Sequence, residues 1–252
     1  MKKSYHFFQK EVTWLLKEKY RNKATPSAYK DIMRLKRGFP VSYLIGFVPF
    51  LNIKVDLSKK PFIPRPETEY WTEIAIGEMK KDKKRIKCLD LFAGSGCIGI
   101  AILKEISKAE VIFGEIDSRA LKQIKINLLL NKIPLKRASL VKTNVFQNIK
   151  GKYDYILANP PYIAQTQKSL VQRSVLFYEP HRALFGGKDG LDYIKQFLKQ
   201  ARFYLKKQGK IYLEFDPFQK NKIQKIIQQQ QYSAYNFFKD QYERWRFVVI
   251  QR

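Results

Sequence analysis

The sequence predicts an α/β protein: a doubly wound, mainly parallel sheet of seven strands, preceded by a small N-terminal helical subdomain and a hairpin linker. Two observations carry this prediction. From residue 86 onward, apolar strand-like runs alternate with helical stretches, which is the pattern of a parallel sheet covered by helices on both faces. A glycine-rich turn and an N-P-P-Y turn each follow an apolar run, at the place where open α/β sheets bind their ligands.

The composition is that of a globular protein. The chain has 252 residues, of which 45% are hydrophobic, so we expect one large domain, alone or with a small appendage. No apolar run approaches the roughly 18 residues that span a bilayer, and the basic N-terminus lacks the apolar core of a signal peptide. The cysteines, Cys88 and Cys97, give neither a disulfide framework nor a metal site. We therefore expect a cytoplasmic protein without membrane contact or metal.

The net charge is strongly positive. Lys and Arg number 49 against 22 Asp and Glu, which gives a formal net charge of +27. Such a field favours polyanions, so nucleic acid or the ribosome is a candidate partner. Lysine is spread along the whole chain with Asn, Gln and Ile, however, as a biased base composition would produce. Both interpretations of the charge stay open.

The chain is expected to divide into three parts. Residues 1–38 contain two amphipathic helices, separated at residues 25–27, and are too few to make an independent core. Residues 39–63 predict a hairpin or extended linker, with β-like runs at 43–45 and 53–55. Residues 64–252 carry the α/β pattern.

The third part begins with a helix at 67–81, whose Glu67 and Glu69 suit the positive end of a helix dipole. The last two strands, joined by a polar turn around Asp240, predict an antiparallel hairpin at the sheet edge. We expect strands at 86–92, 111–116, 139–143, 153–158, 210–215, 232–238 and 246–250, and further helices at 98–106, 118–131, 192–205 and 219–230.

The first strand of the sheet runs into a turn that predicts a cofactor site. Gly94, Gly96 and Gly99 form a G-x-G-x-x-G, in which glycines let the backbone turn tightly and approach a ligand. Glu115 closes the second strand, about 20 residues further on, where an acid can accept both ribose hydroxyls of a nucleoside. This pattern fits NAD as well as S-adenosylmethionine (SAM).

The segment Asn159-Pro160-Pro161-Tyr162 follows the strand expected at 153–158. Two consecutive prolines cannot continue a central strand, because neither has a backbone N–H. A dehydrogenase needs no such turn there, whereas an enzyme that methylates a planar NH₂ does. The side-chain oxygen of Asn159 and the carbonyl of Pro160 can accept the two hydrogens, and Tyr162 can pack against the planar group. Orientation and electrostatics then supply the rate, without a strong base or a metal.

Three further segments make the pattern specific. They are Pro40–Gly46 (P-V-S-Y-L-I-G), Phe62–Glu69 (F-I-P-R-P-E-T-E) and Tyr178–Asp192 (Y-E-P-H-R-A-L-F-G-G-K-D-G-L-D). With them the sequence resembles the class I SAM-dependent methyltransferases, and among these the HemK/PrmC-type release-factor glutamine N5-methyltransferases. The resemblance runs from about Arg34 to near the C-terminus.

The resemblance implies a Rossmann-like fold and methyl transfer from SAM, with S-adenosylhomocysteine as product. The acceptor is the side-chain amide nitrogen (N5) of the glutamine in the Gly-Gly-Gln loop of class 1 peptide chain release factors, which act in translation termination. Residues 1–38 would dock the substrate, and residues 64–252 would form the catalytic domain.

The resemblance also implies roles for individual residues. Catalysis falls to Asn159, Pro160 and Tyr162. The substrate would be bound by Arg65, Pro66, Glu67, Asn159, Pro160, Pro161 and Tyr162. The cofactor would be contacted by Asp90, Phe92, Ala93, Gly94, Ser95, Gly96, Cys97, Ile98, Glu115, Ile116, Asn144, Val145 and Asn159.

The sequence departs from the family pattern at several positions. Glu115 stands where the family usually has Asp, and Asn144-Val145 stands where an Asp and an often aromatic residue contact adenine. The Glu-Ile-Gly of the fifth strand is Glu214-Phe215-Asp216. The N-terminal helical part, which grips the release factor in the family, is short, so substrate docking is expected to differ.

Three other functions are compatible with parts of the sequence. Glutamine methylation of a ribosomal protein uses the same chemistry, but the P-R-P-E-T-E element argues against it. N6-adenine methylation of RNA or DNA suits the charge, but no separate nucleic-acid domain of known pattern is present. A basic ribosome-binding protein on an inactive methyltransferase fold is disfavoured, since the glycines, the acid and N-P-P-Y are intact.

Overall fold

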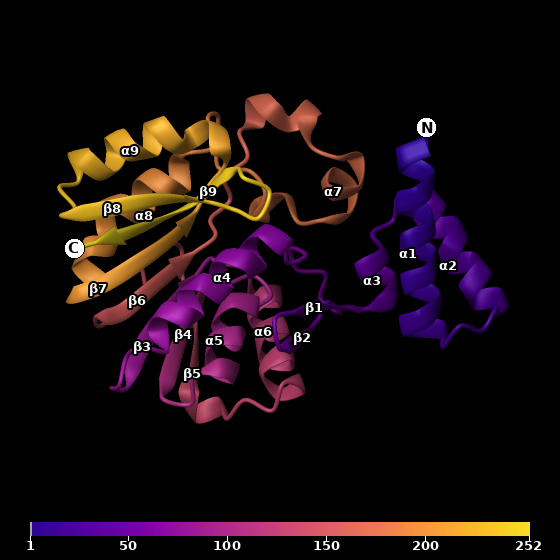
Figure 1. Cartoon of the computed structure of the whole chain (residues 1–252), viewed down its shortest axis with the longest axis horizontal. Coiled ribbons are helices and arrows are strands. Elements are labelled where there is room, and N and C mark those ends of the chain that lie inside the picture. Colours follow the sequence, from indigo (N-terminus) through magenta and orange to yellow (C-terminus); the bar gives the residue numbers. More distant parts are fainter. Residues whose placement is uncertain (1) are drawn as a thin grey trace.

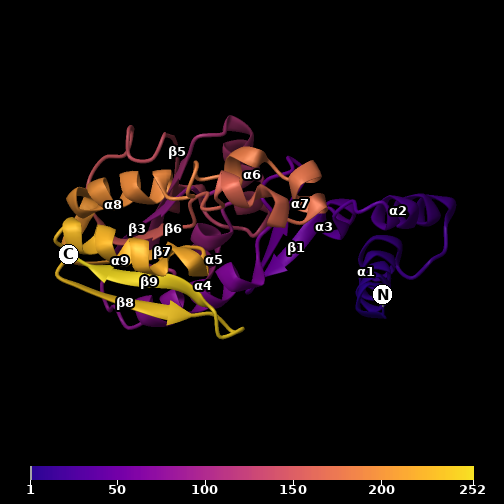
Figure 2. The same ribbon diagram turned by 90° about the horizontal axis from the view of Figure 1, so that it is seen from above.

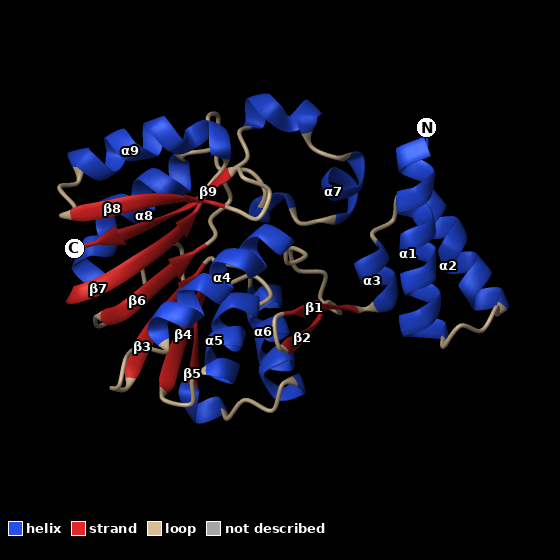
Figure 3. Ribbon diagram, viewed as in Figure 1, coloured by secondary structure: helices blue, strands red, loops and turns tan. Residues whose placement is uncertain are grey.

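A computed structural model describes residues 2–252, and a seven-stranded sheet organises them from residue 86 onward (Figure 1). The strands are β3 (Ile86–Leu91), β4 (Ala109–Glu115), β5 (Ala138–Lys142), β6 (Tyr153–Ala158), β7 (Leu205–Glu214), β8 (Ala234–Lys239) and β9 (Trp245–Gln251). Their order is β5-β4-β3-β6-β7-β9-β8 (Figure 3). The first five pair in parallel, and β9 lies antiparallel between β7 and β8. The predicted sheet and its edge hairpin are confirmed.

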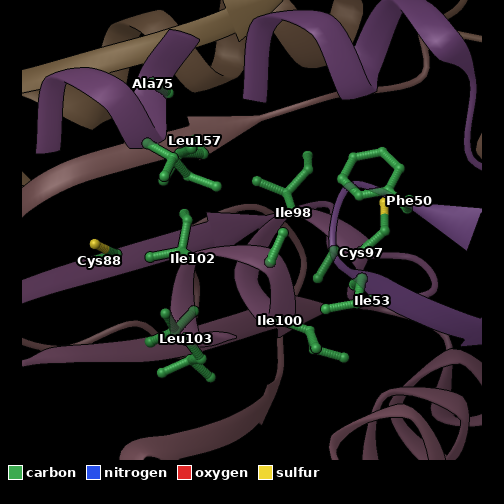
Figure 4. Close-up of a cluster of buried hydrophobic side chains, with 14 of the residues drawn as sticks. Phe50, Ile53, Ala75, Cys88, Cys97, Ile98, Ile100, Ile102, Leu103 and Leu157 are labelled. Atoms are coloured by element: carbon green, nitrogen blue, oxygen red, sulfur yellow. The ribbon is translucent and has the colours of Figure 1, made fainter. Parts of the chain in front are cut away.

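Helices cover both faces of the sheet, because alternate side chains of each strand point to opposite faces. Along β3, Ile86 and Cys88 belong to one apolar cluster, and Leu89 and Leu91 belong to another. The first cluster takes in α4 (Pro66–Met79), α5 (Cys97–Glu105) and α6 (Ser118–Leu130), and the second takes in α8 (Asp192–Tyr204) and α9 (Lys220–Gln229). Figure 4 shows part of the first cluster, in which side chains of α5 lie among Cys88, Leu157 and Phe50.

A two-stranded hairpin, β1 (Phe47–Phe50) and β2 (Ile53–Asp56), is attached to α6 by side-chain amides. Asn131 Oδ1 accepts the backbone N–H of Lys54 over 2.9 Å, and Asn127 Oδ1 accepts that of Asp56 over 2.7 Å. Asn127 lies in the last turn of α6, and Asn131 directly follows the helix, four positions further on. The linker is therefore fixed to the sheet domain through hydrogen bonds that a sequence pattern does not display.

The N-terminal helices form a small unit at one end of the molecule, away from the sheet (Figures 1 and 2). They are α1 (Lys2–Tyr20), α2 (Pro26–Lys36) and α3 (Val41–Ile45), and they share a small apolar cluster around Leu15, Leu35 and Leu44. The buried Asp31 accepts hydrogen bonds from Lys19, Tyr20 and Arg34. The two predicted helices of residues 1–38 are confirmed over the described residues.

Residues 43–45 were expected to be β-like, and this prediction is wrong. They belong to α3, which begins after Pro40 and ends at Gly46, whose φ of 93° only glycine adopts readily. Leu44 is buried in the N-terminal cluster, so tertiary packing overrides the local preference of an apolar run for strand.

The sequence pattern gave no elements between Asn159 and Leu191. The structure has three short ones there: a 3₁₀ helix at Gln165–Leu170, α7 (Arg173–Tyr178) and a second 3₁₀ helix at His181–Ala183. Each is too short to produce a recognisable helical spacing of apolar residues in the sequence. Within residues 2–252, no helix is both long enough and apolar enough to cross a membrane.

Candidate active site

A cavity of about 140 Å³ opens at the carboxyl ends of β3, β4 and β6. The register explains its position. Leu91 of β3 lies opposite Ala158 of β6 and Gly114 of β4, so the loops that follow these strands start side by side. The lining is contributed by six segments, which fall within 59–68, 91–98, 114–120, 143–145, 159–163 and 180–184, and by Tyr193.

The glycine turn forms one wall of the cavity. Gly94 and Gly96 have φ of 54° and 79°, a conformation that side chains rarely adopt. Phe92, Ala93, Gly94, Ser95, Cys97 and Ile98 line the cavity. Gly96 does not, because it faces α6, where an added Cβ would lie 3.1 Å from Ile124.

Asp90 lies beneath this turn and outside the cavity lining. It is fully buried, and its Oδ2 accepts the backbone N–H of Gly99 over 2.9 Å. Its Oδ1 has no hydrogen-bond partner in the described residues, and burial raises the pKa of this carboxyl well above its usual range. The hydrogen bond of Asp90 therefore joins the end of β3 to the first turn of α5.

Glu115 joins the glycine turn to the end of β4. Its Oε2 accepts the N–H of Gly94, and its Oε1 accepts those of Ile116 and Asp117, each over 2.8 Å. Burial raises the pKa of Glu115, although these three donors oppose the rise. A carboxylate has about four acceptor positions, so one remains, on Oε2, where the sequence suggested that both ribose hydroxyls could be accepted.

Phe92 and Val145 line the cavity, and both have a strained backbone. Phe92 has φ of 61°, and Val145, which is β-branched and buried, has φ of 50°. Such conformations are held only by the surrounding structure, and they gather at ligand sites. Here Thr143 supports the turn, since its hydroxyl donates to the carbonyl of Val145. Asn144 is exposed at the rim, and it lines the cavity with Val145 and Ile116.

The N-P-P-Y turn forms the opposite wall, and all four of its residues line the cavity. The side-chain amide of Asn159 donates to the Thr68 hydroxyl over 3.1 Å, and the Tyr162 hydroxyl donates to Glu214 over 2.9 Å. Burial, followed by the charge of Glu214, raises the pKa of Tyr162 well above its usual range. The turn is thus anchored at both ends.

Glu214 and Thr68 were missed as site residues. Glu214 is buried at the end of β7, and it accepts hydrogen bonds from Trp71, Thr68 and Tyr162. Burial raises its pKa, while these donors and Arg246 act to lower it. The signal was the acidic residue at the end of the fifth strand. Two of its partners, Thr68 and Trp71, come from α4, more than 140 positions earlier in the sequence.

Arg65 and Glu67 do not line the first cavity. They line a second one, of about 270 Å³, which shares Phe62, Tyr162, Ile163 and Leu184 with the first. Pro66 lines neither and is the first residue of α4. Arg65 donates to the buried carboxylate of Glu179 over 2.5 Å, which ties the P-R-P-E-T-E segment to the Y-E-P-H-R segment.

Comparisons with known proteins find methyltransferases. The family described as "Methyltransferase small domain" matches residues 69–188. A release factor glutamine methyltransferase of Lactococcus lactis subsp. lactis is 32% identical, over 87% of this chain and 80% of the relative. One of Streptococcus pneumoniae is 33% identical, over 84% of this chain and 74% of the relative.

Solved structures share the fold. A T. thermophilus 16S rRNA N2 G1207 methyltransferase, in complex with AdoMet and guanosine, has a TM-score of 0.60 at 18% identity, over 82% of this chain and 50% of that one. A ribosomal protein L11 methylase of Lactobacillus delbrueckii subsp. bulgaricus has a TM-score of 0.56 at 20% identity, over 79% and 83%. The chain is 32% and 33% identical to the Lactococcus and Streptococcus relatives and spans 80% and 74% of their length. It therefore belongs to the release factor glutamine methyltransferase family.

Proposed function

We propose that this chain uses SAM to methylate the side-chain amide nitrogen (N5) of the glutamine in the Gly-Gly-Gln loop of peptide chain release factors. The observation that carries the proposal is the position of Asn159, an amide at a proline-fixed turn, in the same cavity as the glycine turn. The curated relatives carry the name of this activity, and they do not favour a ribosomal protein or adenine as the acceptor.

The residues of the cavity fit a nucleoside cofactor. Gly94 exposes backbone where an added Cβ would meet nothing closer than 3.9 Å, which leaves room for a ligand against the turn. Glu115 keeps one acceptor position for a ribose hydroxyl, and Asn144 and Val145 would contact the adenine. Bound SAM supplies an electrophilic methyl group. We assign Asp90 and Gly96, which do not line the cavity, to support of the turn.

The substrate amide would be held by the N-P-P-Y turn. Asn159 Oδ1 and the carbonyl of Pro160 would accept the two N–H hydrogens, and Tyr162 would pack against the amide plane. Holding both hydrogens orients the nitrogen lone pair, which is otherwise delocalised into the amide. In well-aligned reactions such orientation lowers the activation barrier by about 7 kcal/mol or more. Pro161 keeps the turn rigid.

Docking of the release factor would use the N-terminal helices and the second cavity. Phe7 and Tyr29 are 64% and 63% exposed on α1 and α2, which is unusual for large apolar side chains. The unit is linked to the site, because Tyr43 donates to the carbonyl of Pro61 over 2.6 Å. Arg65 and Glu67, at the second cavity, would contact the segment around the glutamine. The division into docking helices, linker and catalytic domain is part of this proposal.

The basic surface is a further part of the proposal. Exposed basic residues lie at the amino ends of two parallel strands: Lys83, Lys84 and Arg85 before β3, and Lys206 and Lys207 at the start of β7. The cavity lies at the other, carboxyl end of the sheet. Asp154 offsets only part of this charge, through Lys84 and Lys206. We propose that this end of the sheet contacts the RNA of the ribosome while the cavity acts on protein, and that the protein works in the cytoplasm. Binding to bulk RNA should then weaken steeply with salt.

The test offers labelled SAM with purified release factor and bulk RNA side by side. We expect label on the release factor, and we expect it to disappear when the Gly-Gly-Gln glutamine is replaced. Label on RNA alone would overturn the proposed substrate. If SAM binds but neither the release factor nor the RNA is labelled, the result contradicts both the proposed activity and the proposed substrate.

A further inference from the structure

Glu214 is a buried carboxylate that lines the second cavity and lies beneath the N-P-P-Y turn. Its side chain is 1% exposed, and three groups donate to it: Trp71 Nε1 over 2.6 Å and Thr68 Oγ1 over 2.7 Å, both to Oε2, and the Tyr162 hydroxyl over 2.9 Å to Oε1. Burying a carboxylate is unfavourable unless its oxygens are hydrogen-bonded. The three donors meet that need, and they fix the direction of every hydrogen bond around Glu214.

The direction at Thr68 follows from its neighbour. An ionised carboxylate can only accept, and the indole N–H of Trp71 and the charge of Arg246 favour the ionised form of Glu214. The Thr68 hydroxyl faces the same oxygen and has a single hydrogen, which it must donate to Glu214. The remaining lone pairs of Thr68 Oγ1 can then only accept.

The orientation of Asn159 follows in turn. Its side-chain amide lies 3.1 Å from Thr68 Oγ1. Because Thr68 can only accept there, the NH₂ of Asn159 must face Thr68, and its carbonyl oxygen must face the other way. A reversed amide would set two acceptors against each other. Both residues line the first cavity, and Asn159 comes from the turn while Thr68 comes from the first turn of α4.

We propose that Glu214 and Thr68 are positioning residues, which hold the Asn159 amide so that Oδ1 is presented to the substrate nitrogen. This inference rests on the proposed function, since a presented acceptor serves a substrate that carries N–H groups. The same carboxylate holds Tyr162 through its other oxygen. One buried group thus fixes both ends of the N-P-P-Y turn.

The test compares Thr68→Val with Thr68→Ser in the full chain. Valine keeps the shape of threonine and removes the hydroxyl, whereas serine keeps the hydroxyl. We expect Thr68→Val to lower kcat for release-factor methylation roughly 10- to 100-fold, as loss of a near-attack alignment does, with SAM affinity unchanged within about twofold. Thr68→Ser, which keeps the hydroxyl, is expected to keep kcat within about threefold of the parent chain.

A second readout does not depend on activity. In ¹⁵N-labelled chain, the side-chain NH₂ resonances of Asn159 are identified by their loss in Asn159→Asp. We expect the hydrogen that donates to Thr68 to exchange with solvent about tenfold faster in Thr68→Val than in the parent chain, since an unsatisfied donor loses its protection. In Thr68→Ser it is expected to stay protected.

The outcomes separate the two proposals. Loss of kcat and of amide protection in Thr68→Val, with both retained in Thr68→Ser, supports the positioning role. Full kcat in Thr68→Val, or a loss of kcat without faster exchange at Asn159, overturns it. A parent chain that methylates no release factor overturns the proposed function instead, while amide exchange in the three chains still decides whether Thr68 holds Asn159.

Discussion

The backbone N–H of Gly94 donates to the carboxylate of Glu115 over 2.8 Å, so the glycine turn after β3 and the acid that ends β4 form one unit. We predict that Glu115→Ala weakens SAM binding roughly 10- to 100-fold, because hydrogen bonds to a charged group are worth about 1.5–3 kcal/mol each. Titration calorimetry measures this directly. Glu115→Gln, which keeps an acceptor oxygen, should lose less. Equal affinity in the parent and Glu115→Ala chains would contradict the role given to this residue.

Gly99 packs against the sheet where no side chain fits. A Cβ there would lie 2.3 Å from the ring of Phe113, on the neighbouring strand β4. We predict that Gly99→Ala lowers the free energy of unfolding by about 1–3 kcal/mol, the usual result of overpacking a core. Urea denaturation followed by circular dichroism tests this. Gly77→Ala, on α4 with no heavy atom within 4 Å, is the matched control, and it should be neutral or stabilising.

Asp31 makes the stability of the N-terminal helices depend on pH. Burial acts to raise its pKa, but hydrogen bonds from Lys19, Tyr20 and Arg34 outweigh burial and hold the pKa below its usual value of 3.8. The folded state therefore releases this proton more readily than the unfolded state. The stabilisation is complete above about pH 4 and is lost as the pH falls through the lowered value.

We predict that Asp31→Asn destabilises these helices by roughly 1–3 kcal/mol near neutral pH. The difference from the parent chain should shrink below about pH 4, as Asp31 becomes protonated in both states of the parent. Hydrogen exchange of α1 and α2 at neutral pH, and denaturation as a function of pH, measure the two effects. A difference that stays constant with pH would argue that Asp31 acts through packing alone.

The ion pair between Arg65 and Glu179 links two segments that border both cavities. We predict a coupling of at least about 1 kcal/mol in a double-mutant cycle of Arg65→Ala and Glu179→Ala, since Glu179 is buried and also accepts the backbone N–H of Ile63. The stability of the four chains gives this value. Additive losses would show that the two side chains act independently.

The sheet was predictable because its strands are short apolar runs bounded by turn residues, and because a parallel order follows from the intervening helices. The cavity was predictable for the same reason: ligand sites of such sheets lie at the carboxyl strand ends. Phe92 to Ser95, Glu115 and Asn159 to Tyr162 all line it, as expected from their motifs.

What escaped prediction depends on contacts between distant residues. Tyr43 to Ile45 form a helix because Leu44 packs in the N-terminal cluster, which a local pattern does not reveal. Residues 180–184 border the cavity because Glu179 is tied to Arg65, more than a hundred positions away. The contacts of Glu214 are equally remote. Hydrogen-bond partners of this kind leave no periodic signal in the sequence.

The most direct test of the central claim compares turnover and cofactor binding in Asn159→Ala. If Asn159 holds the substrate amide, methylation of the release factor should fall by at least about 100-fold, as when one positioned group is removed from a reaction centre. SAM affinity should stay nearly normal in the same chain. Unchanged methylation would contradict the account, and loss of SAM binding in Asn159→Ala would show that Asn159 shapes the cavity instead of holding the glutamine.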